Sequence, residues 1–256
     1  MKIEQAHISR NVRFFKDKFL KKYGLVEMHN SSSPLVMFGL YNENDYQILK
    51  AHKGFVIVVW CGSDGSRLTD ARALLLKQQA HKIQHIVTHD FCAMDLKQKG
   101  IPNLSIPITP ITERIAPVPL GNFIYHYGNG ADNFYGDEYL PEIERRTGLH
   151  VIQTTKNTYD KETLLTKIYP KTFIGLRLTK HDGVPTTVIE MGMMGRKCIF
   201  NGSVPHNIRW KGIDDICENI MTEYEKRKDA NYTQISQDVH AFVDVGTDWL
   251  KVDNYK

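Results

Sequence analysis

Long apolar runs are missing from this sequence. The longest, at residues 55–60, is far short of the ~20 apolar residues that a membrane-spanning helix needs. Met1 is followed by a polar segment, where a signal peptide would have a charged start and an apolar core. We therefore expect no membrane-spanning helix, no signal peptide and a cytoplasmic location.

Cysteine is also scarce, and its spacing carries no recognisable pattern. The four cysteines are Cys61, Cys92, Cys198 and Cys217, and no two of them are in a C-x-x-C arrangement. Neither a zinc site nor a disulfide framework follows from such spacing. We expect reduced thiols, with Cys61 and Cys198 behaving as small apolar residues in strand-like runs.

The sequence has little excess charge of either sign. Its formal net charge is +4, which is too small to indicate a dedicated nucleic-acid-binding protein and would suit a diphosphate ligand or an anionic membrane surface. The early cations are Arg10, Arg13, Lys16, Lys18, Lys21 and Lys22. A solvated helix face explains them best, and a basic patch that makes a peripheral membrane contact is the alternative.

Strand-like and helix-like patterns alternate along the chain. The strands are expected at residues 34–41, 55–60, 85–88, 104–108, 122–127, 150–153, 172–176 and 197–201. Helical patterns separate most of them, and two more helices are expected at 213–227 and 234–250. This alternation predicts an α/β protein with parallel sheets.

A proline-rich stretch is the best candidate for a linker between two domains. It holds Pro107, Pro110, Pro117 and Pro119. Because proline interrupts regular structure and stiffens the chain, we place the boundary just after it. The expected domains are residues 1–119 and residues 120–256.

Residues 173–202 contain the pattern that points most directly to a function. A strand is followed by two cations, Arg177 and Lys180, and then by a tight turn at Asp182 and Gly183. Both cations can make charge-assisted bonds to phosphate oxygens. This arrangement predicts an anion-binding loop between a strand and a helix.

The helix that follows this loop adds a second anion-binding feature. Pro185 is expected at its first position, where the missing N–H costs nothing. The next N–H groups, of Thr186, Thr187 and Val188, then have no partner within the helix and favour a phosphate. Glu190 lies one turn further, where its carboxylate can accept hydrogen bonds from two ribose hydroxyls. In the plainer alternative, Asp182 caps a turn and Glu190 is a surface residue.

This segment resembles the donor-binding motif of GT-B glycosyltransferases of the family 4, or group 1, type. That family has two acidic residues separated by seven others, here Asp182 and Glu190, followed by a glycine-rich helix, here Met191-Gly192-Met193-Met194-Gly195. The resemblance implies two Rossmann-like domains with parallel sheets facing a cleft. The first acidic residue is Asp where the family usually has Glu, and residues 127–135 lack the family's basic pair.

The resemblance also implies roles for single residues. Glu190 would hold the ribose, the backbone at residues 186–188 would hold the diphosphate, and Asp182 would lie at the donor sugar. His181 and Gly183 would line the same donor site. His89, which follows an expected strand of the first domain, would approach the donor sugar, although a noncatalytic histidine at a helix start is the favoured alternative.

Three further loops have two interpretations each. Ser63 and Asp64 follow the strand at 55–60, where they would either contact a substrate or cap the next helix. Gly128 and Asn129 would either let the backbone approach a phosphate or form a simple turn, and the turn is favoured. Asn201 and Gly202 either line the nucleotide pocket or form a turn.

We therefore expect a glycosyltransferase that uses a nucleoside-diphosphate sugar as substrate. No cofactor or metal is expected, because helix and cations can support the diphosphate and no D-x-D cluster is present in a suitable loop. The acceptor is an unknown carbohydrate, lipid or protein, and no nucleic-acid partner is expected. One alternative is a noncatalytic nucleotide-sugar or phosphate-binding protein. A dinucleotide-dependent enzyme ranks lower, because no G-x-G-x-x-G follows the first strand of either half.

Overall fold

The computed structural model describes residues 1–128, 134–156, 158–179 and 182–255. The chain forms two compact units, Met1–Thr112 with Val243–Lys256, and Glu113–Phe242. The expected boundary lay after residue 119, whereas the division falls after Thr112. The expectation also placed residues 243–256 in the second domain, but the chain returns to the first unit near its end. The expected helix at 234–250 is interrupted: α9 spans Tyr232–Val243, Gly246 adopts a left-handed φ of 61°, and a short 3-10 turn follows at Asp248–Leu250.

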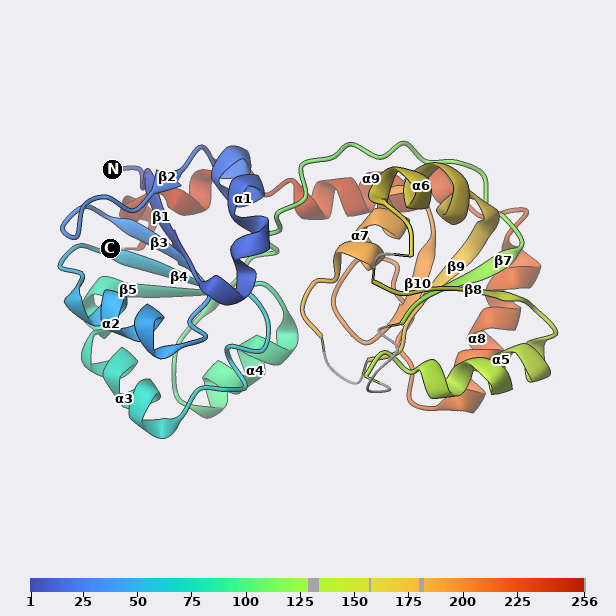
Figure 1. Ribbon diagram of the computed structural model, residues 1–256, viewed down its shortest axis with the longest axis horizontal. Helices are drawn as coiled ribbons and strands as arrows, with labels where there is room; N and C mark the ends of the chain where they lie inside the picture. The colour runs from blue at the N-terminus through green and yellow to red at the C-terminus, as the bar shows by residue number, and fades with distance from the viewer. Residues whose placement is uncertain (129–133, 157, 180–181, 256) are drawn as a thin grey trace. The chain divides into compact units, whose positions relative to one another are not determined.

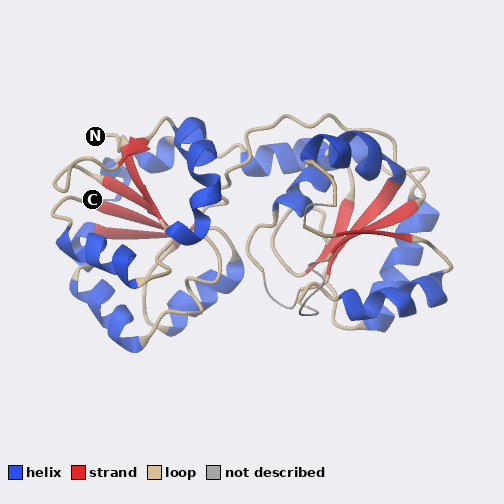
Figure 2. Cartoon of the chain, viewed as in Figure 1, coloured by secondary structure: helices blue, strands red, loops and turns tan. Residues whose placement is uncertain are grey.

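The first unit is a parallel sheet of six strands in the order β2-β1-β3-β4-β5-β6. Its strands are β1 (Gln5–Ile8), β2 (Val26–Glu27), β3 (Leu35–Phe38), β4 (Val56–Trp60), β5 (Ile83–Val87) and β6 (Leu104–Ser105). Its helices are α1 (Lys16–Tyr23), α2 (Glu43–Ala51), α3 (Asp70–Gln78) and α4 (Asp90–Gln98). Figure 2 shows helices on both faces of these strands.

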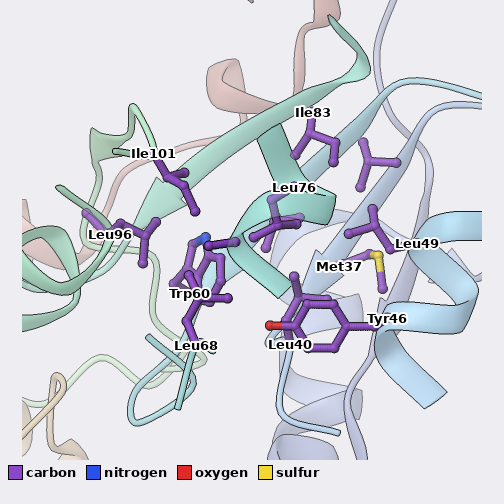
Figure 3. Close-up of a cluster of buried hydrophobic side chains, with 14 of the residues drawn as sticks. Met37, Leu40, Tyr46, Leu49, Trp60, Leu68, Leu76, Ile83, Leu96 and Ile101 are labelled. Carbon is purple, nitrogen blue, oxygen red and sulfur yellow. The ribbon is translucent and has the colours of Figure 1, made fainter. Parts of the chain in front are cut away.

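Alternate side chains of the buried strands pack into two different apolar clusters, one on each face of this sheet. On one face, Val58 and Trp60 of β4 pack with residues of α2, α3 and α4, and Figure 3 shows Trp60 near Leu68 and Leu96 of this cluster. On the other face, Val59 packs with α1 and with Trp249. Successive side chains of a strand point to opposite faces, so a strand that is buried on both sides is apolar throughout.

The second unit is a parallel sheet of four strands in the order β10-β9-β7-β8. Its strands are β7 (Phe123–Tyr127), β8 (Val151–Thr154), β9 (Thr172–Arg177) and β10 (Lys197–Phe200). Its helices are α5 (Leu140–Thr147), α6 (Lys161–Thr163), α7 (Thr186–Met193), α8 (Ile213–Lys226) and α9. Helices α5 and α8 pack on one face of the sheet, and Figure 1 shows α6, α7 and α9 on the other. The expected α/β architecture with parallel sheets is confirmed.

Within the described ranges, no helix combines the length and the apolar character that crossing a bilayer requires.

A buried histidine makes the stability of the first unit depend on pH. The Trp60 indole N–H donates to Nδ1 of His85 at 3.2 Å, and burial lowers the pKa of His85 to about 4. The folded state therefore keeps this ring neutral at pH values where the unfolded chain, with a pKa near 6.5, takes up a proton. As the pH falls from 6.5 to 4, the first unit should lose up to about 3 kcal/mol of stability.

Urea unfolding at pH 7 and pH 4.5 measures this loss. His85→Gln keeps an acceptor for the indole but cannot titrate, so its stability should fall less over the same range. His81→Gln, at an exposed position, is the matched control and should behave as the wild type does. Equal losses in all three proteins would contradict the assignment to His85.

Candidate functional site

The carboxyl end of β9 and the start of α7 form the centre of the site expected from the sequence. Strand β9 lies between β10 and β7, and each of its residues is buried. Pro185 was expected at the first position of the helix. It is instead the residue just before α7, with φ −66° and ψ 131°. Among the residues that the structure describes, no side chain caps this helix start. Ile189 donates the first helical bond, to the carbonyl of Pro185 at 3.2 Å.

The N–H groups that precede Ile189 are those of Thr186, Thr187 and Val188. They lie at the positive end of the helix dipole, which favours an anion. Thr186 and Thr187 are partly exposed, so the start of α7 is accessible to solvent, whereas Val188 is buried. This part of the expected anion site is therefore present in the backbone.

Glu190 lies one turn into α7 and is 7% exposed. Its Oε1 is 3.0 Å from the amine of Lys161, and its Oε2 accepts a 3.4 Å hydrogen bond from the Tyr169 hydroxyl. The surface position of the plainer interpretation is therefore wrong for Glu190. A nearly buried carboxylate beside a helix start has a defined position and can bind hydroxyl groups.

Arg177 and Asp182, both expected to face the donor, bind each other. Nε and Nη2 of Arg177 both donate to Oδ2 of Asp182, the former at 2.7 Å. The guanidinium also lies over the Tyr135 ring, 4.2 Å from its centroid, and 5.8 Å from that of Tyr127. The second Asp182 oxygen accepts from the N–H of Gly183 at 2.7 Å. The ion pair and the cation–π contacts together fix the orientation of Arg177.

A histidine on β7 extends this cluster, and the sequence analysis did not identify it. His126 is fully buried, and its Nε2 is 2.6 Å from Oδ1 of Asp137. Burial lowers the pKa of His126, although the Asp137 carboxylate opposes the shift. Gly128 follows this strand, and a Cβ there would lie 2.6 Å from the same Asp137 oxygen. An added side chain would displace this carboxylate, and both interpretations of Gly128 remain predictions.

Lys161 is the second functional candidate that the sequence analysis missed. Its amine is 3.0 Å from Glu190 and 2.8 Å from Oε1 of Glu113. Burial alone would lower the pKa of Lys161, but the hydrogen bond with Glu113 and the charge of Glu190 outweigh it and raise the pKa. The only signal in the sequence was a cation at the start of a short helical pattern, which is too common to single out.

Asp64, one of the candidates in the first unit, holds neighbouring loops in place. Asp64 is fully buried and accepts N–H bonds from Leu40, Cys61 and Gly62 at 3.0–3.3 Å. Burial raises its pKa despite these bonds. It does not cap α3, whose cap is Thr69. It fixes the loops that follow β3 and β4, whereas Ser63 beside it is exposed.

His89 is the residue that caps α4. Its Nδ1 accepts the N–H of Cys92 at 3.3 Å, and the side chain is 5% exposed. This position agrees with the noncatalytic alternative for His89. Lys180, His181 and Asn129 lie outside the described residues. Among the residues that the structure describes, no three His, Cys, Asp or Glu side chains are grouped so that they could hold a metal ion.

No family model matches the sequence, and no curated protein matches it either. Solved structures do match the fold. A glycosyltransferase from Rickettsia africae aligns with a TM-score of 0.60 and 10% identity over 98% of this chain and 96% of that chain. Sucrose-phosphate synthase from Thermosynechococcus elongatus aligns with a TM-score of 0.59 and 13% identity over 93% and 76%.

TarM aligns with a TM-score of 0.58 and 12% identity over 82% of this chain and 52% of its own, so the chain spans about half the length of TarM. Identities this low establish the fold alone. The resemblance expected from the motif at residues 182–190 is confirmed at that level: the chain has the fold of GT-B glycosyltransferases.

Proposed function

We propose that this protein is a glycosyltransferase that binds a nucleoside-diphosphate sugar at the start of α7. The observation that carries the proposal is a helix start that no described side chain caps, with the nearly buried carboxylate of Glu190 one turn further along. Backbone N–H groups at a helix start bind phosphate, and a carboxylate can accept bonds from the 2′- and 3′-hydroxyls of ribose. Together they match two parts of one nucleoside diphosphate.

In the proposed reaction an acceptor hydroxyl forms a bond to the anomeric carbon while the bond to the diphosphate breaks. The acceptor proton is released to solvent, and the diphosphate leaves with the electron pair of the broken bond and the negative charge that this pair brings. The N–H groups of Thr186 and Thr187 stabilise that charge, together with the guanidinium of Arg177 if Asp182 releases it. Asp182 lies on the sugar side, and the anomeric configuration is retained.

The comparisons support the choice of ligands. One matching structure is of a S. aureus TarM variant in complex with UDP, alpha-GlcNAc-glycerol and fondaparinux; it has a TM-score of 0.56 and 12% identity, over 53% of its own chain. We propose by analogy that this chain takes a nucleotide sugar as donor and a carbohydrate-containing molecule as acceptor.

The alternative is a nucleotide-sugar-binding protein without turnover. The ion pair between Arg177 and Asp182 favours it, because the charge expected to face the diphosphate is already compensated. Incubation with UDP-, GDP- and ADP-sugars separates the two functions. Release of the diphosphate or transfer of the sugar supports the enzyme, whereas tight binding without either supports the binding protein.

Glu190→Ala is expected to weaken binding of a nucleoside diphosphate by about a hundredfold. The change removes an acceptor of two charge-assisted hydrogen bonds, each of which contributes about 1.5–3 kcal/mol. Calorimetry with UDP, GDP, ADP and CDP measures the affinities. Glu218→Ala, at an exposed position on α8, is the matched control and should bind as the wild type does. If none of the four nucleotides binds, or if Glu190→Ala binds equally well, the proposal is wrong.

A further inference from the structure

Lys161 lies between two carboxylates beside the proposed ribose subsite. Its amine is 3.0 Å from Oε1 of Glu190 and 2.8 Å from Oε1 of Glu113. The Lys161 side chain is 37% exposed, so part of it borders solvent, while that of Glu190 is only 9% exposed. Ion pairs on the protein surface contribute little, but a carboxylate with so little exposure depends on its partners for its orientation.

The fold brings Lys161 to this place from a distant part of the sequence. Strand β8 ends at Thr154, and Lys161 is the first residue of α6, whose start is capped by Asp160 through a 2.7 Å bond from the Thr163 N–H. Helix α6 and α7 lie on the same face of the sheet in Figure 1. Lys161 therefore reaches Glu190 from a different helix than the one that carries it.

Tyr169 completes the support of the same carboxylate. The chain continues from α6 through a π-turn to Tyr169, which is 1% exposed and donates to Oε2 of Glu190. Its ring packs edge-on against Tyr125, with centroids 4.9 Å apart. Within the described part of the chain, each oxygen of Glu190 thus has one donor, and each keeps a second lone pair for a ligand hydroxyl. A carboxylate held at both oxygens has a fixed plane.

We propose that Lys161 is a positioning residue that sets the preference of this site for ribose over 2′-deoxyribose. The inference rests on the proposed function, because it assigns Glu190 to the ribose. Lys161 holds Oε1 of Glu190 so that the two carboxylate oxygens meet the 2′- and 3′-hydroxyls together. Glu113 also binds the Lys161 amine and keeps it in place when the ligand binds. Without Lys161 the carboxylate rotates, and the bond to the 2′-hydroxyl is lost first.

The test compares UDP, GDP and ADP with their 2′-deoxy forms by calorimetry. The wild type should bind the ribose form of its preferred nucleotide about tenfold more tightly, which corresponds to one hydrogen bond to a charged group. In Lys161→Met that ratio should fall to about twofold or less. Lys161→Arg, which keeps a cation between the two carboxylates, should restore most of it. Lys167→Met, an exposed lysine in the turn that follows α6, is the matched control and should keep the wild-type ratio.

The outcomes separate this inference from the proposed function. If the wild type binds none of the nucleotides, both fail. If the wild type binds with a clear ribose preference and Lys161→Met keeps the ratio, the inference alone is wrong. An equal loss of affinity for both forms would show that Lys161 acts on the diphosphate or on stability, and would also overturn it. Lys161→Gln decides the matter in the same way if the methionine variant does not fold.

Discussion

Arg196→Met is expected to remove about 4 kcal/mol or more from the stability of the second unit. Arg196 is 1% exposed, its described hydrogen bonds all go to backbone carbonyl groups, and burial lowers its pKa to about 10. The acceptors are the carbonyls of Thr172, Val118, Met194, Pro119 and Pro170. Methionine fills most of the volume but donates nothing. The carbonyls of Thr172 and Met194 also accept from the N–H groups of Gly121 and Val118, so the loss falls mainly on the other three, and each buried carbonyl left without a donor costs about 1–3 kcal/mol.

Hydrogen exchange of the β9 amides measures this loss within the second unit. A global unfolding transition would combine the contributions of the two units. Arg145→Met removes an exposed guanidinium on α5 and should change the protection by less than about 0.5 kcal/mol. If the protection of β9 in Arg196→Met stays within about 1 kcal/mol of the wild type, the guanidinium is not the structural centre that its hydrogen bonds indicate.

Gly121→Ala should destabilise the same unit by about 3 kcal/mol or more. A Cβ at Gly121 would lie 2.0 Å from the carbonyl oxygen of Lys171 and 2.1 Å from its carbon. Two backbone bonds hold these segments together, from Gly121 to the Thr172 carbonyl at 3.0 Å and from Asn122 to that of Lys171 at 2.9 Å. The clash is with backbone, which cannot rotate away, so the pairing just before β7 and β9 must separate.

Gly212→Ala is the matched control for this substitution. Its backbone is extended, with φ −167°, and an added Cβ would meet no atom within 4 Å. Hydrogen exchange of the β9 amides should show Gly212→Ala within about 0.5 kcal/mol of the wild type. Equal stability of the two alanine variants would mean that the approach at Gly121 relaxes without cost.

The sequence predicted the strands whose own side chains form the core. Strand β4 was recognisable because its residues are apolar and mostly β-branched, and β9 because an apolar run precedes a cation. Strand β1 was missed because it carries polar side chains that tertiary contacts satisfy. Gln5 donates to the carbonyls of Asn30 and Ser33, and His7 lies 2.9 Å from buried Asp45. Hydrophobic periodicity cannot show such contacts.

The candidate site also has features that the sequence predicted and contacts that it could not predict. The start of α7 was predictable because proline, an unpartnered helix start and the position of Glu190 are local features. The ion pairs were not, since they depend on where loops lie in space. Arg177 and Asp182 were each assigned to a ligand, although the loop brings them together. Lys161 and Glu190 are far apart in the sequence, and only the packing of α6 beside α7 makes them partners.

The return of residues 243–256 to the first unit bears on how the protein is made. Trp249 packs edge-on against Tyr23, with centroids 5.2 Å apart, and Ile3 donates to the carbonyl of Leu250 at 3.0 Å. During synthesis every residue of the second unit leaves the ribosome before Trp249 does. The second sheet can therefore form while one face of the first is covered by α1 but still lacks Trp249, Leu250 and Val252. A fragment that stops at residue 112 would leave part of that apolar face exposed, so an expressed first unit needs residues 243–256 joined to it.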